Sequence, residues 1–234
     1  MFVKLLLLIV VLAATAAGVY YGVNNIYDEF QFASEEAQTS LEVTEAQTAE
    51  LEASSTKSDM IAYAIIGCAF AAAFGLFANP TGSIATKLLG GILGAVLGAV
   101  GGVAAGYIGH WYDSAVGFPN DPVFYWVGRW FLMLLPLAVG SGIAIAASGK
   151  FGKQLSDSMA GTILGTGLVT IIYCFTSGSA TRKEGHNKIL PAFEENRILL
   201  IALLSIIGIT AFLLLSRKPK AAAMAAEDKA AAQA

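Results

Sequence analysis

The sequence offers few residues whose chemical groups could carry out a reaction, and their positions argue against catalysis. Ser141, between Gly140 and Gly142, is the best candidate nucleophile. A nucleophilic serine needs a histidine base within hydrogen-bond reach. Ser141 lies toward one end of its apolar segment, whereas His110 and His186 fall at or beyond the opposite ends of theirs. The three side chains therefore cannot meet, and we expect a protein that is not an enzyme.

Metal and nucleotide chemistry also lack the residues that they need. His110, Asp113 and His186 are the residues that could share a metal ion, but they are scattered, and no H-E-x-x-H pair is present. Cys68 and Cys174 are the two cysteines, too few for a four-cysteine zinc site or a disulfide scaffold. The sequence contains no Walker motif and no G-x-G-x-x-G after a strand. We expect no metal site and no cofactor.

Arg129 is an ionisable residue well inside an apolar segment, three residues after Trp126 and next to Trp130. Charged groups within a membrane span mark functional sites by default. One interpretation is an anion or carboxylate site that faces a cavity. The other is a side chain that reaches the lipid headgroups and contacts Trp126 through a cation–π interaction. The sequence favours the second interpretation.

Hydroxyl groups recur at every fourth position of a later apolar segment, where they share one face of a helix. The series is Ser158, Thr162, Thr166 and Thr170, followed by Cys174. Such a stripe either forms hydrogen bonds between helices or lines a path for water, ions or a small solute. We favour the hydrogen bonds, and keep Arg129, Thr162, Thr166 and Thr170 as a possible permeation path. Pro136 is expected to bend the neighbouring helix.

The composition explains why so few groups are available. Of the 234 residues, 56% are hydrophobic and 13% are charged, about half the charged share of a soluble domain. The 14 basic and 17 acidic residues give a net charge of −3, so there is no basic surface for nucleic acid. These values exclude an ordinary cytosolic enzyme and a disordered protein. They indicate a polytopic membrane protein.

Six segments are apolar over about the 20 residues that a bilayer requires. They are residues 3–23, 60–78, 87–109, 123–147, 155–177 and 197–216. Backbone amides in lipid must form hydrogen bonds within their own segment, so each is expected to be a helix. The predicted fold is an all-α transmembrane bundle of six helices. It has five helices if residues 1–23 are a cleaved signal peptide rather than the membrane anchor that we favour.

The chain divides into four parts on this basis. After the anchor or signal peptide at 1–23 comes an acidic outer segment at 24–59, then a five-helix bundle at 60–216 and an Ala/Lys-rich tail at 217–234. The acidic segment favours helix over 33–53, with a weak coiled-coil seam. It is either a docking or oligomerisation helix or a solvated spacer. Because the seam contains much Thr and Ser, the spacer is favoured.

Glycines form the strongest local pattern. They occupy every fourth position of the 87–109 segment at Gly90, Gly94, Gly98, Gly102 and Gly106, and a shorter series contains Gly161 and Gly165. Glycine weakens a helix, so these positions must gain from close contact between helices. We predict a glycine zipper on a central helix that packs against two neighbours. It acts within the bundle, as we favour, or across a homo-oligomer.

The distribution of Lys and Arg predicts the orientation. With the N-terminus inside, eight basic residues fall on the inner side and five on the outer side, so both termini are expected to be cytoplasmic. All Trp and Tyr residues then fall at or near the outer interface. A bacterial cytoplasmic membrane is the default location.

These observations predict a non-catalytic membrane protein. Its expected role is a packing or assembly subunit of a homo-oligomer or membrane complex, with the lipid bilayer and itself or another membrane protein as partners. The alternative is a small channel or solute permeation protein that uses the hydroxyl stripe.

Overall fold

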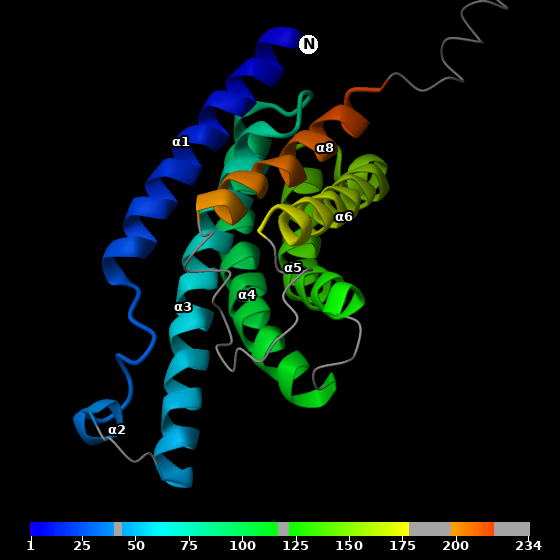
Figure 1. Ribbon diagram of the computed structural model, residues 1–234. Helices are drawn as coiled ribbons and strands as arrows, with labels where there is room; N and C mark the ends of the chain where they lie inside the picture. Colours follow the sequence, from blue (N-terminus) through cyan, green and yellow to red (C-terminus); the bar gives the residue numbers. More distant parts are fainter. Residues whose placement is uncertain (40–43, 117–121, 178–197, 218–234) are drawn as a thin grey trace, which may run out of the picture.

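The structure, a computed structural model, describes residues 1–39, 44–116, 122–177 and 198–217. Within these ranges the chain forms helices and no β-strand (Figure 1). The helices are α1 (Phe2–Ile26), α2 (Glu35–Thr39), α3 (Glu45–Phe77), α4 (Ile84–Val116), α5 (Pro122–Ala147), α6 (Phe151–Thr176) and α8 (Ser205–Leu215). Residues 198–203 are also helical, and a turn at Leu204 joins them to α8.

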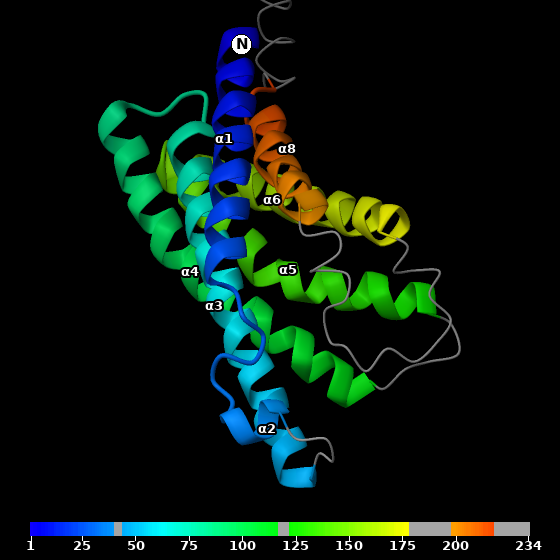
Figure 2. The same cartoon turned by 60° about the vertical axis from the view of Figure 1, so that its left-hand side comes forward.

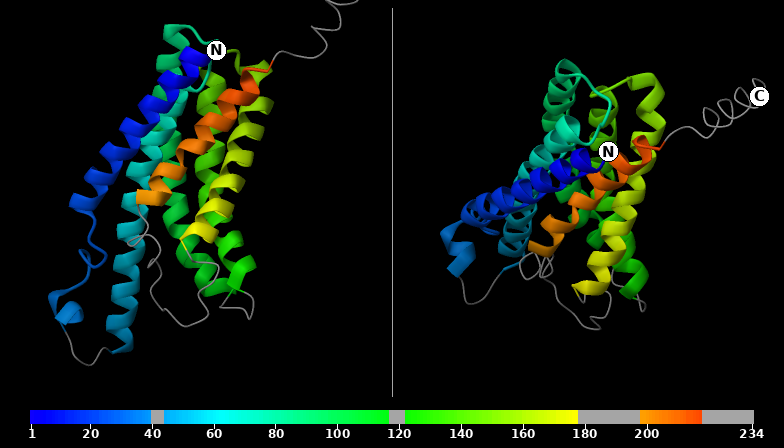
Figure 3. Two further views of the ribbon diagram at one scale, coloured as in Figure 1. Left: turned by 45° about the horizontal axis from the view of Figure 1, so that its top comes forward. Right: turned by 90° about the horizontal axis from the view of Figure 1, so that it is seen from above.

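Six helices are long and apolar enough to cross a membrane, as predicted. They are Phe2–Ile26, Glu45–Phe77, Ile84–Val116, Val123–Ala147, Phe151–Thr176 and Ile198–Leu215. From α3 to α6, each helix packs against the next one in the sequence, and α8 packs on α6 (Figure 3). Helix α1 contacts both α3 and α8 and so completes a ring of helices. Contacts between α3 and α5 cross this ring. The all-α bundle is therefore confirmed.

The N-terminus lies at the same end of the bundle as two helix connections and the end of α8 (Figure 1). The Nζ atom of Lys4 donates a hydrogen bond to the carbonyl oxygen of Pro80, 2.7 Å away. Asn79 donates to the carbonyl oxygen of Ile145 at 3.1 Å and to the side chain of Gln154 at 2.7 Å. These bonds tie the α3–α4 and α5–α6 connections together. We call this the N-terminal end of the bundle and the opposite one the distal end.

Helix α3 is longer than the predicted span, because it begins at Glu45 rather than near residue 60. Thr44 and Gln47 form a capping box, in which the Thr44 side chain accepts from the Gln47 amide and the Gln47 side chain accepts from the Thr44 amide. The intervening sequence is rich in Glu, Ala and Gln, which are good helix formers. Residues 45–59 of the acidic segment therefore continue directly into the apolar part of α3, and residues 59 and 60 both lie inside this helix. The single helix predicted over 33–53 is not formed, because Thr44 is extended and separates α2 from α3.

The glycines of α4 lie where α4 meets α3. A Cβ atom built at Gly90, Gly94, Gly98, Gly102 or Gly106 would come within 3.0 Å of the α3 backbone. A Cβ at Gly101 would lie 2.9 Å from the carbonyl oxygen of Pro136 on α5. Helix α4 thus contacts two neighbours through its small residues, while Ile92, Val96 and Val100 on the other face are exposed. Gly161 and Gly165 of α6 face Ala211 and Ile207 at the other helix pair, α6 and α8.

Candidate functional site

An ion pair between a buried arginine and a partly exposed aspartate joins α4 to α5 near the distal end. The guanidinium of Arg129 donates to both carboxylate oxygens of Asp113, from Nε at 2.7 Å and from Nη2 at 2.9 Å. The Arg129 side chain is 1% exposed and the Asp113 side chain is 22% exposed. A bidentate arginine–carboxylate pair of this kind is among the strongest hydrogen-bonded arrangements available to side chains. It fixes the rotation of the two helices relative to each other.

Aromatic and sulfur atoms complete the surroundings of Arg129. Its guanidinium carbon lies 5.6 Å from the ring centre of Trp126 and 5.5 Å from that of Trp130, within cation–π distance. Its Nη1 atom donates to the sulfur of Met133 at 3.2 Å. The Tyr125 hydroxyl donates to the same carboxylate, that of Asp113. The positive charge of Arg129 is therefore paired with the Asp113 carboxylate and surrounded by side chains of the same protein.

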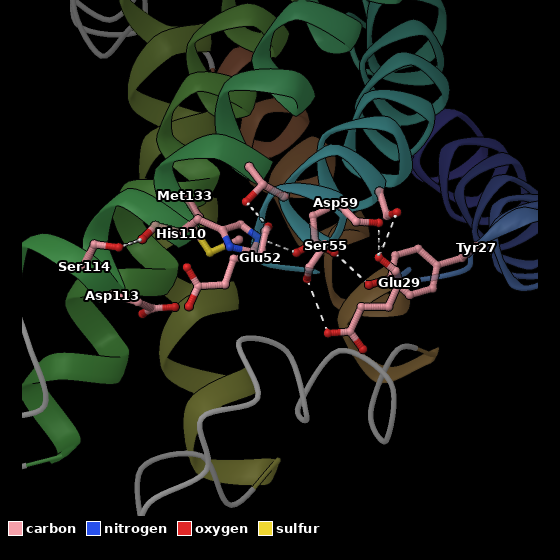
Figure 4. Close-up of polar contacts among 12 residues, drawn as sticks. Tyr27, Glu29, Glu52, Ser55, Asp59, His110, Asp113, Ser114 and Met133 are labelled. Atoms are coloured by element: carbon pink, nitrogen blue, oxygen red, sulfur yellow. Dashed lines mark hydrogen bonds and ion pairs between the residues drawn. The ribbon is translucent and has the colours of Figure 1, made fainter. Parts of the chain in front are cut away.

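A second carboxylate, Asp59 of α3, accepts two hydrogen bonds in the same region. His110 Nε2 lies 2.8 Å from one carboxylate oxygen, and the Tyr27 hydroxyl donates to the other at 2.8 Å. The Asp59 side chain is 2% exposed and that of His110 is 11% exposed. Figure 4 shows Tyr27, Asp59 and His110 pointing toward one another. This triplet joins the end of α1 to α3 and α4.

Helix α4 positions both groups. His110 and Asp113 are three residues apart and therefore lie on neighbouring parts of one helix face. His110 turns to Asp59 on α3, and Asp113 turns to Arg129 on α5. We call Tyr27, Asp59, His110, Asp113, Tyr125 and Arg129 the distal cluster. In this cluster one aspartate, Asp113, pairs with Arg129, and the other, Asp59, is hydrogen-bonded to His110 and Tyr27.

The structure corrects the favoured interpretation of Arg129. Its side chain is buried between the helices rather than extended away from the bundle, and Asp113 provides its charged partner there. The expected contact with Trp126 is present, and Trp130 adds a second ring. The aromatic residues also differ from a simple interface belt. Tyr63 and Tyr173 are 2% and 0% exposed, so they pack in the interior.

The hydroxyl stripe of α6 faces the interior of the bundle. Ser158, Thr162, Thr166 and Thr170 are all buried. Ser158 donates to the carbonyl oxygen of Gln154 and Thr162 to that of Met159, both on α6. The hydroxyl oxygens of Thr166 and Thr170 are buried without a hydrogen-bond partner, as are Ser141 Oγ and Trp130 Nε1 on α5. None of the four hydroxyl side chains of the stripe therefore donates the hydrogen bond to a neighbouring helix that the stripe was expected to provide, because Ser158 and Thr162 donate within α6 and Thr166 and Thr170 have no partner.

Among the described residues, no three His, Cys, Asp or Glu side chains are close enough to hold a metal ion. His186, the third member of the scattered set, lies outside the described residues. His110 and Asp113 instead serve the distal cluster. The sequence analysis considered both residues only as weak candidates for a metal site and did not predict their pairing with Asp59 and Arg129.

The acidic segment folds onto the first turns of α3. Ser58 Oγ donates to the carbonyl oxygen of Asp28 at 2.7 Å, and Ser54 Oγ donates to that of Glu29 at 3.1 Å. Ser34 binds the Glu50 carboxylate through its amide, 2.7 Å away, and its hydroxyl, 3.2 Å away. Figure 2 shows α2 beside the projecting part of α3. We call residues 27–39 and 44–58 the acidic cap.

The comparisons with known proteins identify no relative. No protein family model matches the chain, and no similar curated protein or solved structure was found. The function must therefore be argued from the fold and the site.

Replacing Asp59 with asparagine tests the triplet of the distal cluster. The change removes the charge that both Tyr27 and His110 face, so we expect a loss of about 1–2 kcal/mol in the free energy of unfolding. Chemical unfolding in detergent micelles measures the effect. Asp157→Asn, at an exposed position on α6, is the matched control and should change stability little. Equal stabilities of the two variants would contradict a bonding role for Asp59.

Proposed function

We propose that this protein is a non-catalytic integral membrane subunit that binds a partner through its acidic cap. One observation carries the proposal: the cap is a folded unit rather than a free spacer. Ser54, Ser55 and Ser58 are at most 3% exposed, and they hold residues 28–32 against α3. A solvated linker needs no such bonds, because its backbone can bind water. A fixed surface is what recognition requires.

The charge of the cap indicates the kind of partner. Glu35, Glu45 and Glu52 are exposed, and Lys57 is the basic residue of this segment. Complementary charge guides association and selects partners more than it adds affinity. We propose a membrane protein with a basic surface outside the bilayer as the partner, which includes a second copy only if it presents such a surface.

The test is purification from the native membrane in a mild detergent, followed by mass measurement. We expect a complex larger than one chain that weakens as the salt concentration rises. The triple variant Glu35→Gln, Glu45→Gln, Glu52→Gln should lose the partner but keep the thermal stability of the single chain. Asp157→Asn, at the N-terminal end, should retain the partner. A complex that survives the triple variant, or a single chain in the native membrane, would overturn the proposal.

The glycines of α4 support a role within the chain. We propose that Gly90, Gly94, Gly98, Gly102 and Gly106 form a glycine zipper against α3 rather than a seam between copies. Their close approach to the α3 backbone leaves this face covered. Any contact with a second copy must then use other surfaces.

A small channel is the second candidate, and one observation favours it. Thr166, Thr170, Ser141 and Trp130 have buried polar atoms without partners along the α5–α6 contact. Such atoms are rare in native proteins and often bind water. If this line of groups conducts, reconstituted vesicles should pass ions or small solutes, and Thr166→Leu should remove most of that flux. Ile163→Leu, also on α6 but outside this line of polar groups, is the control. Absence of flux in the unmodified protein would contradict a channel.

Basic residues support an orientation. Lys4, Lys87, Lys150, Lys153 and Arg217 belong to the N-terminal end, so we propose that this end is cytoplasmic. A bacterial cytoplasmic membrane is the proposed location. Tags at both ends of the chain should be protected in sealed right-side-out vesicles, and accessibility of either tag would contradict this orientation.

A further inference from the structure

A groove lies on the outside of the bundle between α5, α6 and α8. Its volume of about 550 Å³ is typical of sites for small ligands. Phe131 of α5, Leu164 and Leu168 of α6, and Leu213 of α8 are among the apolar side chains that line it. Leu164 and Leu168 are 60% and 46% exposed, so the groove is open to the surrounding lipid. Its surface suits a hydrocarbon chain.

Two residues of the groove, Gly167 and Thr210, favour the binding of an apolar chain. Gly167 leaves space, since a Cβ atom built there would meet only Phe131, at 4.0 Å. Thr210 lines the groove, but its hydroxyl lies 2.7 Å from the Gly161 carbonyl oxygen, to which it donates. That polar group is therefore already satisfied and does not require water.

Arg217 is the charged residue among those that line the groove. Gly161 faces Ala211 and Gly165 faces Ile207, so α6 and α8 run in opposite directions. Ile171 and Arg217 therefore lie at opposite ends of the groove. At 1.5 Å of rise per residue they are about 24 Å apart, which is most of the thickness of a bilayer core.

The charge of Arg217 is not neutralised by the described part of the chain. Arg217 is exposed and makes no ion pair among the described residues. Asp157 of α6 lies at a similar level along the bundle but is not paired with it. Lys218 and Lys220 follow in the sequence and add positive charge to the segment after α8. A basic group at the membrane surface attracts anionic lipid headgroups.

We propose that this groove is a binding site for an anionic phospholipid. One acyl chain lies along Leu164, Leu168 and Leu213, and the phosphate binds the guanidinium of Arg217. A guanidinium group carries the charge opposite to that of a phosphate and can donate two parallel hydrogen bonds to its oxygens. The apolar groove retains the chain and Arg217 provides the preference for an anion. This inference does not depend on the proposed partner of the acidic cap.

Native mass measurement of the detergent-purified chain tests the proposal. The chain is mixed in separate experiments with phosphatidylglycerol, phosphatidylcholine and inorganic phosphate. We expect bound phosphatidylglycerol in clear preference to phosphatidylcholine, and no retained inorganic phosphate. Arg217→Gln should reduce that preference about fivefold, the effect of one basic residue near an anionic surface. Lys153→Gln removes the same charge at the same end outside the groove and should leave the preference unchanged.

Filling the groove tests the position of the acyl chain. Gly167→Phe should reduce the binding of both lipids, while the lipid-free protein keeps its thermal stability because the new side chain enters open space. If that variant folds poorly, Leu168→Ser tests the same part of the groove by replacing an exposed apolar side chain of its wall with a polar one. An unchanged preference in Arg217→Gln would overturn the proposal. So would unchanged lipid binding in both groove variants, or a dimer that Gly167→Phe disrupts, since the groove would then hold a second copy.

Discussion

Replacing Asp113 with alanine is expected to lower the free energy of unfolding in detergent by about 3–5 kcal/mol. The change leaves the guanidinium of Arg129, 1% exposed, inside the bundle without its carboxylate partner. The contacts with Trp126, Trp130 and Met133 remain, but none of them carries a compensating negative charge. Chemical unfolding followed by tryptophan fluorescence measures the loss. The effect is large because one charge is removed and its partner is not.

A double variant separates this explanation from a simple loss of packing. Asp113→Ala combined with Arg129→Met removes both charges, so it should recover more than half of the stability that the single variant loses. Asp157→Ala is the control, because its carboxylate is exposed on α6. If Asp113→Ala alone changes stability by less than about 1 kcal/mol, Arg129 has access to water or headgroups, and the ion pair does not contribute substantially to the stability of the bundle.

Gly98→Leu is the second change for which we expect a large effect. A Cβ atom at this position would lie within 3.0 Å of the Gly67 carbonyl oxygen, which is backbone and cannot move aside alone. Helices α3 and α4 must therefore separate, and the variant should lose about 3 kcal/mol or more, at the upper end of overpacking effects. Lower yield on detergent extraction and a lower midpoint of thermal unfolding are the expected results.

Gly22→Leu provides the matched comparison for that change. Gly22 also lies within a helix, α1, but a Cβ there would meet nothing within 4 Å. This variant should be neutral or slightly stabilising, since leucine favours helix more than glycine does. Equal behaviour of the Gly22 and Gly98 variants would show that the packing of α4 on α3 is looser than the structure describes.

The distal cluster illustrates how far sequence reasoning reaches for a site. Arg129 was recognisable because a charge inside an apolar segment is costly and needs an explanation. Its partner was not, because Asp113 lies beyond the predicted end of its span and is also suited to metal binding or solvent exposure. Asp59 was counted as part of an acidic segment, although it is buried and bonded to His110. Sequence position alone does not say which of several acids turns inward.

The sequence alone is sufficient to predict six helices that are long and apolar enough to cross a membrane. Apolar runs of sufficient length must be helices in lipid, and this rule is local, so the six spans could be read directly. The tertiary structure decided the partners: which neighbours the glycine face meets, which carboxylate receives Arg129, and where α3 begins. These depend on the rotation and depth of each helix, which arise from the packing of all the helices together. A local sequence pattern restricts which helix faces can pack together but does not identify the helix or side chain that each one contacts.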